Sequence, residues 1–261
     1  MRIFKLMRKL VFFILTVSLF SCAPPVRPPL VVPEASKDEL LGVIAGNAAT
    51  FKSLKGVARI SFQEPGQKTL KGKQILLVEK PRRIRSEILG LFGQPAAVAV
   101  VNGENASLLV PREGILYQGE ASAHNLQRIL RIPLKIQDLV NFILYQVPVI
   151  EYRTSTMEIL AEGGFRLLLK GEGELLEELY FNVEHQLVKV RFKKGPEEIL
   201  MLTYGDFSDG ERPFPRHQVL HLPGPGIEAR VEFSSLETNV ELDEKLFRLK
   251  KPEGFQIRQL L

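Results

Sequence analysis

The sequence is poor in residues that form covalent cross-links or metal clusters. Its 261 residues include one cysteine, Cys22, and no tryptophan. A single cysteine allows no disulfide within the chain and no thiolate zinc cluster. Outside the N-terminus, the sequence also has no marked excess of basic or acidic residues. Residues 1–21 hold four of the 35 basic and none of the 30 acidic residues, which leaves 31 against 30. We therefore expect no nucleic-acid partner.

Catalytic motifs are lacking as well. Ser107, Ser122 and the other serines lie in no Gly-x-Ser-x-Gly elbow. The stretch Gly171–Gly173 lacks the lysine and the helix of a phosphate loop. His217 and His221 are four residues apart on a predicted strand, but no third metal ligand is near them in the sequence. We expect no enzymatic activity, no cofactor and no metal.

Two runs of like charge are interpreted as solvated outer faces. The basic run has a second interpretation, contact with anionic headgroups or a partner. The acidic run lies beside a glycine turn. The runs are Arg82, Arg83 and Arg85, and Glu172, Glu174, Glu177 and Glu178.

The N-terminus has the pattern of an export signal. Four cationic residues precede an apolar run, Leu10 to Phe20, and a small residue, Ser21, precedes Cys22. The run is shorter than the ~20 residues of a spanning helix. The segment resembles a bacterial lipoprotein signal, in which the cysteine becomes the lipidated N-terminus, although Phe20 is atypical of that motif. An ordinary signal peptide and a signal anchor are the alternatives.

The sequence divides into three parts. Residues 1–21 are the expected lipoprotein signal peptide, and residues 22–35 hold the lipidated Cys22 and a tether with five prolines. A proline-rich segment is extended and semi-rigid, so it would hold a domain away from a membrane. Residues 36–261 are expected to form a single domain, since neither a repeat nor a second linker interrupts them.

One helix is predicted at the start of this domain, and strands follow it. Ser36 and Glu39 form a capping box before apolar residues at helical spacing, which predicts a helix over about 37–53. From Gly56 the period changes to two, which predicts short strands separated by turns. Asn102-Gly103 is a strong hairpin signal. The predicted strands after residues 56–63 are 68–79, 82–89, 96–101, 106–110, 115–118, 157–162, 165–170, 176–182, 187–193, 198–204, 216–222 and 227–235.

The alternation breaks between Ala121 and Tyr145, where two short helices are predicted on either side of Ile132-Pro133. Many short consecutive strands make a meander that must curl. The predicted fold is mainly β: a curved antiparallel sheet of about ten or eleven strands, with an N-terminal helix and a two-helix lid insert.

This order of elements resembles the LolB branch of the LolA/LolB family of lipoprotein carriers. The resemblance is carried by Gly56–Ile60, Arg83–Leu89, Leu91–Gly93, Ile132–Pro148 and the closing Leu246–Phe255. It implies an unclosed half-barrel whose helices cover an apolar cavity for acyl chains. It further implies an outer-membrane lipoprotein, anchored by fatty chains such as palmitate on Cys22 and facing the periplasm. Such a protein is a chaperone that receives lipoproteins from a soluble LolA-like carrier and inserts them in the outer membrane.

The resemblance places the membrane-insertion element on Phe92, with Leu91 beside it. The two lie between Gly90 and Gly93, and exposed apolar side chains at a loop tip are typical of a contact site. The alternative is that both fold back into the core.

We expect the protein to be a monomer.

The apolar faces of the insert provide the cavity candidates. A packed core is the alternative for the same residues, and the protein would then be a scaffold of an envelope complex. Another amphiphilic lipid is a further possible cargo. The candidates are Leu126, Ile129, Leu130, Leu139, Val140 and Ile143.

Overall fold

The computed structural model describes residues 34–260. Cys22, the expected signal peptide and most of the tether lie outside the described residues. The described part contains α2 (Lys37–Thr50), α3 (Ala123–Leu130) and α4 (Ile136–Ile143), together with two short 3-10 helices, η1 (Pro111–Glu113) and η2 (Glu244–Phe247). None of its helices is long and apolar enough to cross a bilayer.

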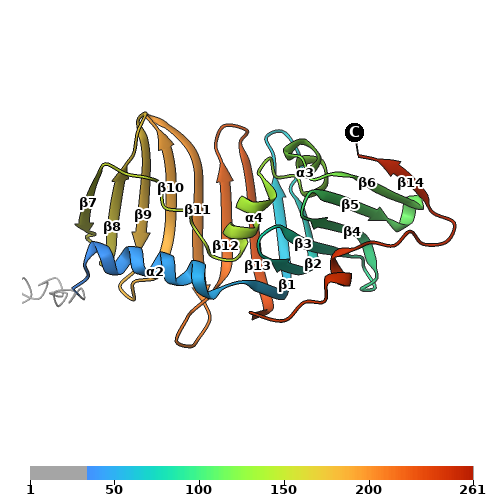
Figure 1. The fold of residues 1–261 in the computed structure, drawn as a ribbon, viewed down its shortest axis with the longest axis horizontal. Coiled ribbons are helices and arrows are strands. Elements are labelled where there is room, and N and C mark those ends of the chain that lie inside the picture. The colour runs from blue at the N-terminus through green and yellow to red at the C-terminus, as the bar shows by residue number, and fades with distance from the viewer. Residues whose placement is uncertain (1–33, 261) are drawn as a thin grey trace, which may run out of the picture. The chain divides into compact units, whose positions relative to one another are not determined.

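All strands of residues 34–260 join one sheet, drawn in Figure 1. Its strands are β1 (Ser53–Gln63), β2 (Leu70–Glu79), β3 (Arg83–Leu89), β4 (Pro95–Asn102), β5 (Asn105–Val110), β6 (Ile115–Glu120), β7 (Thr154–Ile159), β8 (Phe165–Lys170), β9 (Leu175–Phe181), β10 (Leu187–Lys194), β11 (Glu197–Phe207), β12 (Pro215–Leu222), β13 (Ile227–Thr238) and β14 (Gln256–Gln259).

The sheet consists of two meanders that meet in its middle. The order is β14-β6-β5-β4-β3-β2-β1-β13-β12-β11-β10-β9-β8-β7. Strand β1 therefore pairs with β13, and β14 and β7 are the two edge strands. All pairs are antiparallel except β14 with β6, which is parallel. The predicted fold class is confirmed, but the expected ten or eleven strands are too few. Each segment between two turns forms its own strand, and β14 adds another at an edge.

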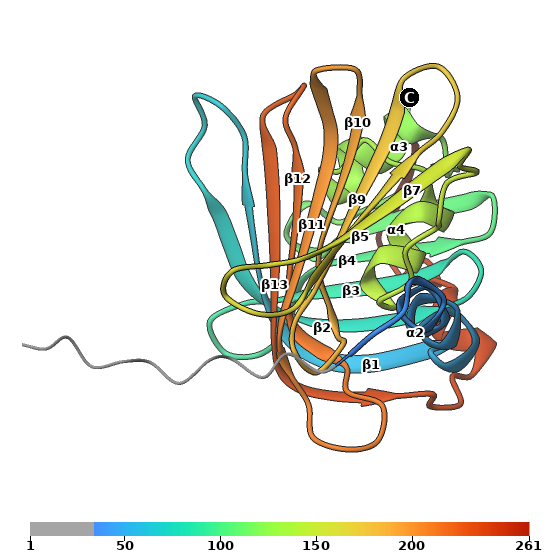
Figure 2. The same ribbon diagram turned by 90° about the vertical axis from the view of Figure 1, so that its left-hand side faces the viewer.

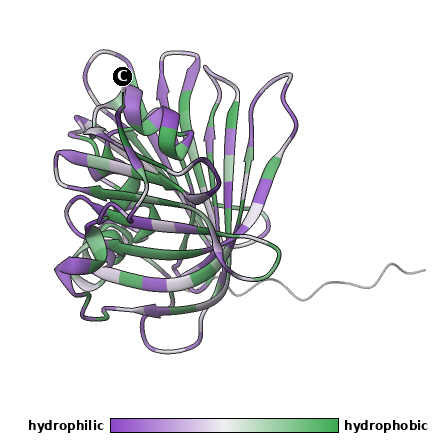
Figure 3. Cartoon of the chain, turned by 90° about the vertical axis from the view of Figure 1, so that its right-hand side faces the viewer, coloured by the Kyte–Doolittle hydropathy of each residue, from purple (hydrophilic) through white to green (hydrophobic). Residues whose placement is uncertain are grey.

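The sheet is strongly bent, and the helices lie in its hollow. In Figure 2 the strands β7–β13 stand upright while β3–β5 run across behind them, with α2, α3 and α4 inside the bend. Figure 3 shows apolar and polar residues alternating along the strands, as expected where one face is buried. The main core lies within the hollow, and its members come from the helices and from both meanders.

The seam between the meanders depends on a glycine. β1 shifts its register against β13 between Val57 and Ala58. A Cβ atom on Gly56 would lie 2.8 Å from the Ser235 carbonyl oxygen and 2.9 Å from the Phe233 ring. The two strands therefore approach closely here only because residue 56 has no side chain.

The capping box of α2 forms as predicted. The Ser36 hydroxyl accepts from the Glu39 N–H (3.2 Å), and the Glu39 carboxylate accepts from the Ser36 N–H (2.7 Å). The helix ends at Thr50, three residues before its predicted end. Phe51 leaves the helix with an extended backbone and packs against Phe214, with ring centroids 5.0 Å apart.

A second, smaller core covers the outer face of β2–β4. There the segment that contains η2 packs on the sheet through Leu242 and Phe247. Arg85 donates to the Leu246 carbonyl (2.8 Å) and pairs with Glu87 (2.6 Å). The C-terminal segment therefore stiffens the meander that forms one wall of the hollow.

Candidate functional site

Helix α4 is fixed to the second meander by its carboxyl end. Tyr145 donates to the Leu187 carbonyl (2.9 Å), and Gln218 donates to the Ile143 carbonyl (3.1 Å). Tyr204 donates to the Phe142 carbonyl (3.3 Å), and burial raises its pKa well above that of a free phenol, so the hydroxyl stays neutral. The Gln218 bond satisfies the Ile143 carbonyl, which lies at the helix end where intrahelical partners run out.

Helix α3 is attached more lightly. Only Asn125 and Leu126 of this helix are buried. The Asn125 amide donates to the Glu120 carbonyl (2.9 Å), and the Ser122 hydroxyl caps the helix by accepting from the Asn125 N–H. The helix ends at Arg131, which adopts a left-handed conformation with φ of 62°. The rest of α3 lies over the hollow with few buried contacts.

An apolar cavity of about 480 Å³ lies between the two helices and the sheet. Ligand pockets in proteins commonly measure about 300–1,000 Å³. Its walls come from β1–β5 and from β11–β13, and its cover comes from α3, α4 and the segment between them. Its buried apolar lining includes Leu76, Ile84, Ala99, Leu139, Phe142, Leu202, Leu220 and Ala229. The interior under the insert is therefore hollow rather than packed.

The uncharged polar side chains in the lining are hydrogen-bonded within the protein. Ser86 donates to the Gln74 side chain, while Tyr204 and Gln218 donate to the carbonyls of α4 described above. Since these donors already have partners, the cavity offers a ligand mainly apolar surface. An acyl chain needs no more, because each buried methylene contributes about 0.8 kcal/mol.

The mouth of the cavity is marked by lining residues that are also exposed. Leu70 at the start of β2 is 51% exposed, and Ile88 near the end of β3 is 39% exposed. Arg128 and Arg131 bound the mouth from the end of α3. The opening thus lies between the β1–β2 hairpin, the end of the β3–β4 hairpin and α3.

The β3–β4 turn projects apolar side chains into solvent beside this mouth. The Gly93 N–H donates to the Gly90 carbonyl (3.0 Å), so Leu91 and Phe92 are the tip of a tight turn, and Gly93 has φ of 81°. Leu91 is 98% exposed and Phe92 is 91% exposed. Strand pairing places Ile88, a mouth residue, opposite Ala97 just before this turn.

The residues predicted for the cavity divide into two groups. Ile129, Leu130, Leu139 and Ile143 line it. Leu126 and Val140 do not: both are fully buried and belong to the core that attaches the helices. Helical spacing shows which face of a helix is apolar, but it does not show which part of that face meets a void.

The basic run predicted on an outer face pairs with carboxylates. Arg83 pairs with Glu79 (2.8 Å) and Arg85 pairs with Glu87, while Arg82 pairs with Glu104. These arginines are therefore neutralised by neighbours within the protein. Within residues 34–260, no three His, Cys, Asp or Glu side chains are placed to hold a metal ion.

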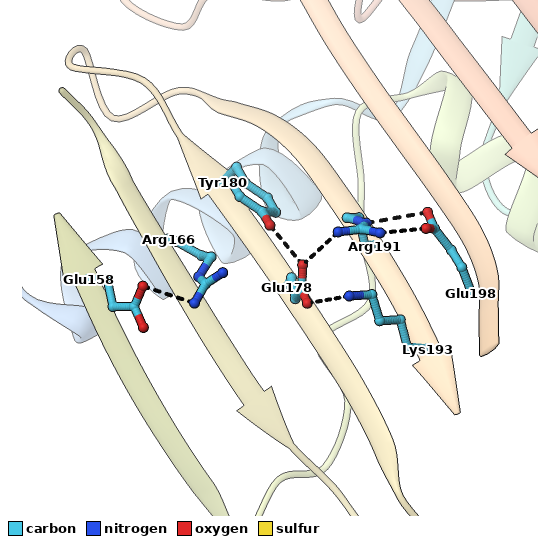
Figure 4. Close-up of polar contacts among 7 residues, drawn as sticks. All are labelled: Glu158, Arg166, Glu178, Tyr180, Arg191, Lys193 and Glu198. Atoms are coloured by element: carbon cyan, nitrogen blue, oxygen red, sulfur yellow. Dashed lines mark hydrogen bonds and ion pairs between the residues drawn. The ribbon is translucent and has the colours of Figure 1, made fainter. Parts of the chain in front are cut away.

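The interpretation of the acidic run as a solvated face is wrong for two of its members. Glu178 is mostly buried in an ion network across the outer face of β7–β11 (Figure 4). It accepts from Lys193 (2.6 Å) and from the Tyr180 hydroxyl (2.7 Å). The network balances three carboxylates with three cations, and its members are Glu158, Arg166, Glu178, Tyr180, Arg191, Lys193 and Glu198.

Glu177 points to the other face and is fully buried. One of its oxygens accepts from the Ile150 N–H (2.9 Å), and the other has no partner among residues 34–260. Burial raises the pKa of Glu177 from 4.5 to about 7. The charged form is thus disfavoured in the folded protein. The carboxyl holds the segment after α4 and lies outside the cavity lining.

This carboxyl predicts a pH-dependent stability. Between about pH 4.5 and 7 the folded chain keeps a proton that the unfolded chain releases, so the free energy of unfolding falls as pH rises, by up to about 3 kcal/mol. Glu177→Gln should remove this slope, measured by urea unfolding at pH 4.5 and pH 8. Glu184→Gln, in an exposed turn, is the matched control. Parallel pH profiles for Glu177→Gln and the wild type would contradict the prediction.

No protein-family model and no curated protein sequence matches this chain. Solved structures share its fold, including these three. A putative outer membrane lipoprotein-sorting protein domain from Vibrio parahaemolyticus aligns with a TM-score of 0.52 and 12% identity, over 80% of this chain and 94% of that one. A LolA superfamily protein from Nitrosomonas europaea aligns with a TM-score of 0.51 and 12% identity, over 83% and 99%.

The third is a DUF1329 family protein from Desulfovibrio piger, with a TM-score of 0.51 and 12% identity over 81% of this chain and 96% of that one. At these identities the similarity concerns the fold. The described part of the chain is therefore a LolA-like open half-barrel, as the bent sheet with helices in its hollow indicates.

Proposed function

We propose that this protein is a LolB-like lipoprotein of a bacterial envelope, which binds the acyl chains of lipidated cargo and helps to insert that cargo in the outer membrane. The observation that carries the proposal is the apolar cavity beneath α3 and α4, whose mouth adjoins the exposed Leu91–Phe92 turn. A scaffold protein would have no use for such a void, since empty apolar space lowers stability.

The proposed process moves an acyl chain from one apolar environment to another, without covalent chemistry. A soluble LolA-like carrier would deliver the chain to the mouth, and the chain would slide between the apolar walls. Leu91 and Phe92 would enter the bilayer next to the mouth. Burying both would contribute on the order of 3–5 kcal/mol, enough to hold the mouth at the membrane while the chain leaves.

The proposed location follows from the N-terminus and from the neighbours. Lipidation of Cys22 would anchor a periplasm-facing monomer, and the proline-rich tether would separate it from the bilayer. Ala23 stands after the cysteine, where the resemblance to lipoprotein sorting signals expects aspartate for retention in the inner membrane. The lipoprotein-sorting description of the Vibrio structure supports the same compartment.

Lipid analysis of the purified protein tests the proposal. The full chain without its signal peptide is purified from membranes and examined by native mass spectrometry and lipid extraction. We expect bound acyl lipid or lipopeptide, followed by its transfer to vesicles in a loaded-carrier assay. A protein free of lipid that also fails to take up a diacylated peptide would overturn the proposal.

A further inference from the structure

The charge at the cavity mouth has one sign. Three of the lining residues are charged, and all three are exposed cations: Lys71 on β2, Arg128 in the last turn of α3 and Arg131 just after that helix. Lys71 alternates along β2 with Leu70 and Gly72, which face the cavity, so its side chain lies on the outer face of the sheet and only the two arginines can serve the mouth. None of the lining residues, which all belong to the described part of the chain, is an aspartate or a glutamate. A chain with almost equal numbers of acidic and basic residues has thus gathered cations alone at this opening.

The two mouth arginines also differ from other arginines in having no acidic partner. Within residues 34–260, Arg128 and Arg131 take part in no ion pair. By contrast, Arg83 and Arg85 on the neighbouring strand β3 both pair with glutamates. The mouth arginines therefore remain available to an anion from outside the protein.

Both arginines lie at the carboxyl end of α3, which bounds the opening. Figure 2 shows this helix across the hollow from the β1–β2 hairpin. An amphiphile whose chain fills the apolar interior places its headgroup at the mouth, beside the two arginines. The planar guanidinium groups of arginine match the oxygens of a phosphate.

We infer that the cavity selects amphiphiles with an anionic, phosphate-bearing headgroup, held at the mouth by Arg128 and Arg131. This inference rests on the proposed function, since it assumes that an acyl chain occupies the interior. The apolar walls supply affinity for any chain of suitable length. The cations discriminate between headgroups, because a zwitterionic headgroup cancels their attraction with its own positive charge.

The test compares two lipids that differ only in the headgroup. Lyso-phosphatidylglycerol and lyso-phosphatidylcholine with the same chain are titrated as monomers, below the concentration at which they form micelles, by displacement of a fluorescent fatty acid. We expect the wild type to bind the phosphatidylglycerol form at least fivefold more tightly. Changing Arg128 and Arg131 together to Gln should bring this ratio near one, because it should weaken phosphatidylglycerol binding much more than phosphatidylcholine binding.

A matched control removes two other exposed cations that lie outside the lining, by the changes Lys194→Gln and Arg216→Gln. This control should keep the wild-type ratio. Equal binding of the two lipids by the wild type would overturn the inference alone, and so would a preference that survives the mouth variant. Failure to bind either lipid would overturn the proposed function as well. A preference that appears only with phosphatidylglycerol vesicles, and not with monomers, would assign the cations to the membrane surface and overturn the inference.

Discussion

Replacing Ala99 with Phe is expected to reduce acyl-chain binding at least tenfold while the chain stays folded. Ala99 lies on β4 and lines the cavity, and its paired neighbours Ser86 and Leu108 line it too. A phenyl ring at this position projects into empty space. If it keeps only two methylenes of a ligand from contact, the loss is about 1.6 kcal/mol, which exceeds a tenfold change in Kd.

The measurement is a titration with a fluorescent fatty acid, together with thermal unfolding of the same samples. Ala96→Phe is the matched control, because Ala96 is exposed on the same strand and lies outside the cavity lining. It adds the same atoms without entering the cavity, so it should bind lipid like the wild type. Unchanged binding by a well-folded Ala99→Phe variant would mean that acyl chains bind elsewhere.

Phe92→Glu should separate binding from delivery. The Phe92 side chain is almost fully exposed at the tip of its turn, so its replacement should leave the free energy of unfolding and the affinity for acyl chains unchanged. Transfer of cargo to vesicles should fall by tenfold or more. Withdrawing one phenylalanine from a bilayer costs about 1.5–3 kcal/mol, and a charge at the same depth costs more.

Two further variants show whether charge or lost apolar surface is responsible. Gln67→Glu adds the same negative charge in the exposed turn after β1 and should transfer cargo normally. Phe92→Leu keeps an apolar tip and should retain most of the activity. Wild-type transfer by Phe92→Glu, in a vesicle assay with a loaded carrier, would remove the turn from the mechanism.

The sequence predicted most of the sheet because its signals are local. Alternation in segments such as Ala58–Phe62 indicates a half-buried strand, and turn signals such as Asn102-Gly103 separate the strands. β14 was missed because all four of its residues are exposed, so no alternation marks it, and its partner β6 is distant in the chain. Nothing near Gln256 in the sequence points to Ile115.

The sequence predicted where an apolar interior lies, but it did not predict that part of this interior is an empty cavity. An apolar stripe such as Leu126, Ile129 and Leu130 predicts that a helix covers something apolar. Whether the facing strands fill the space depends on side chains more than 50 residues away in the sequence, such as Leu202 and Ala229. The cationic mouth was missed for the same reason, because nothing near Arg128 and Arg131 in the sequence shows that they border a cavity walled by distant strands.

The pairing of β1 with β13 determines when the cavity forms during folding. Ala58 pairs with Phe233 across this seam, and the cavity has walls on both sides of it. Each meander can assemble from neighbouring hairpins, but contacts so distant in the chain form slowly. If the protein is exported as proposed, a chain that has not yet emerged as far as Phe233 exposes the apolar faces of two half-sheets and has no cavity. Such a chain would need chaperones itself, and it would become able to hold lipid only in the last step of its own maturation.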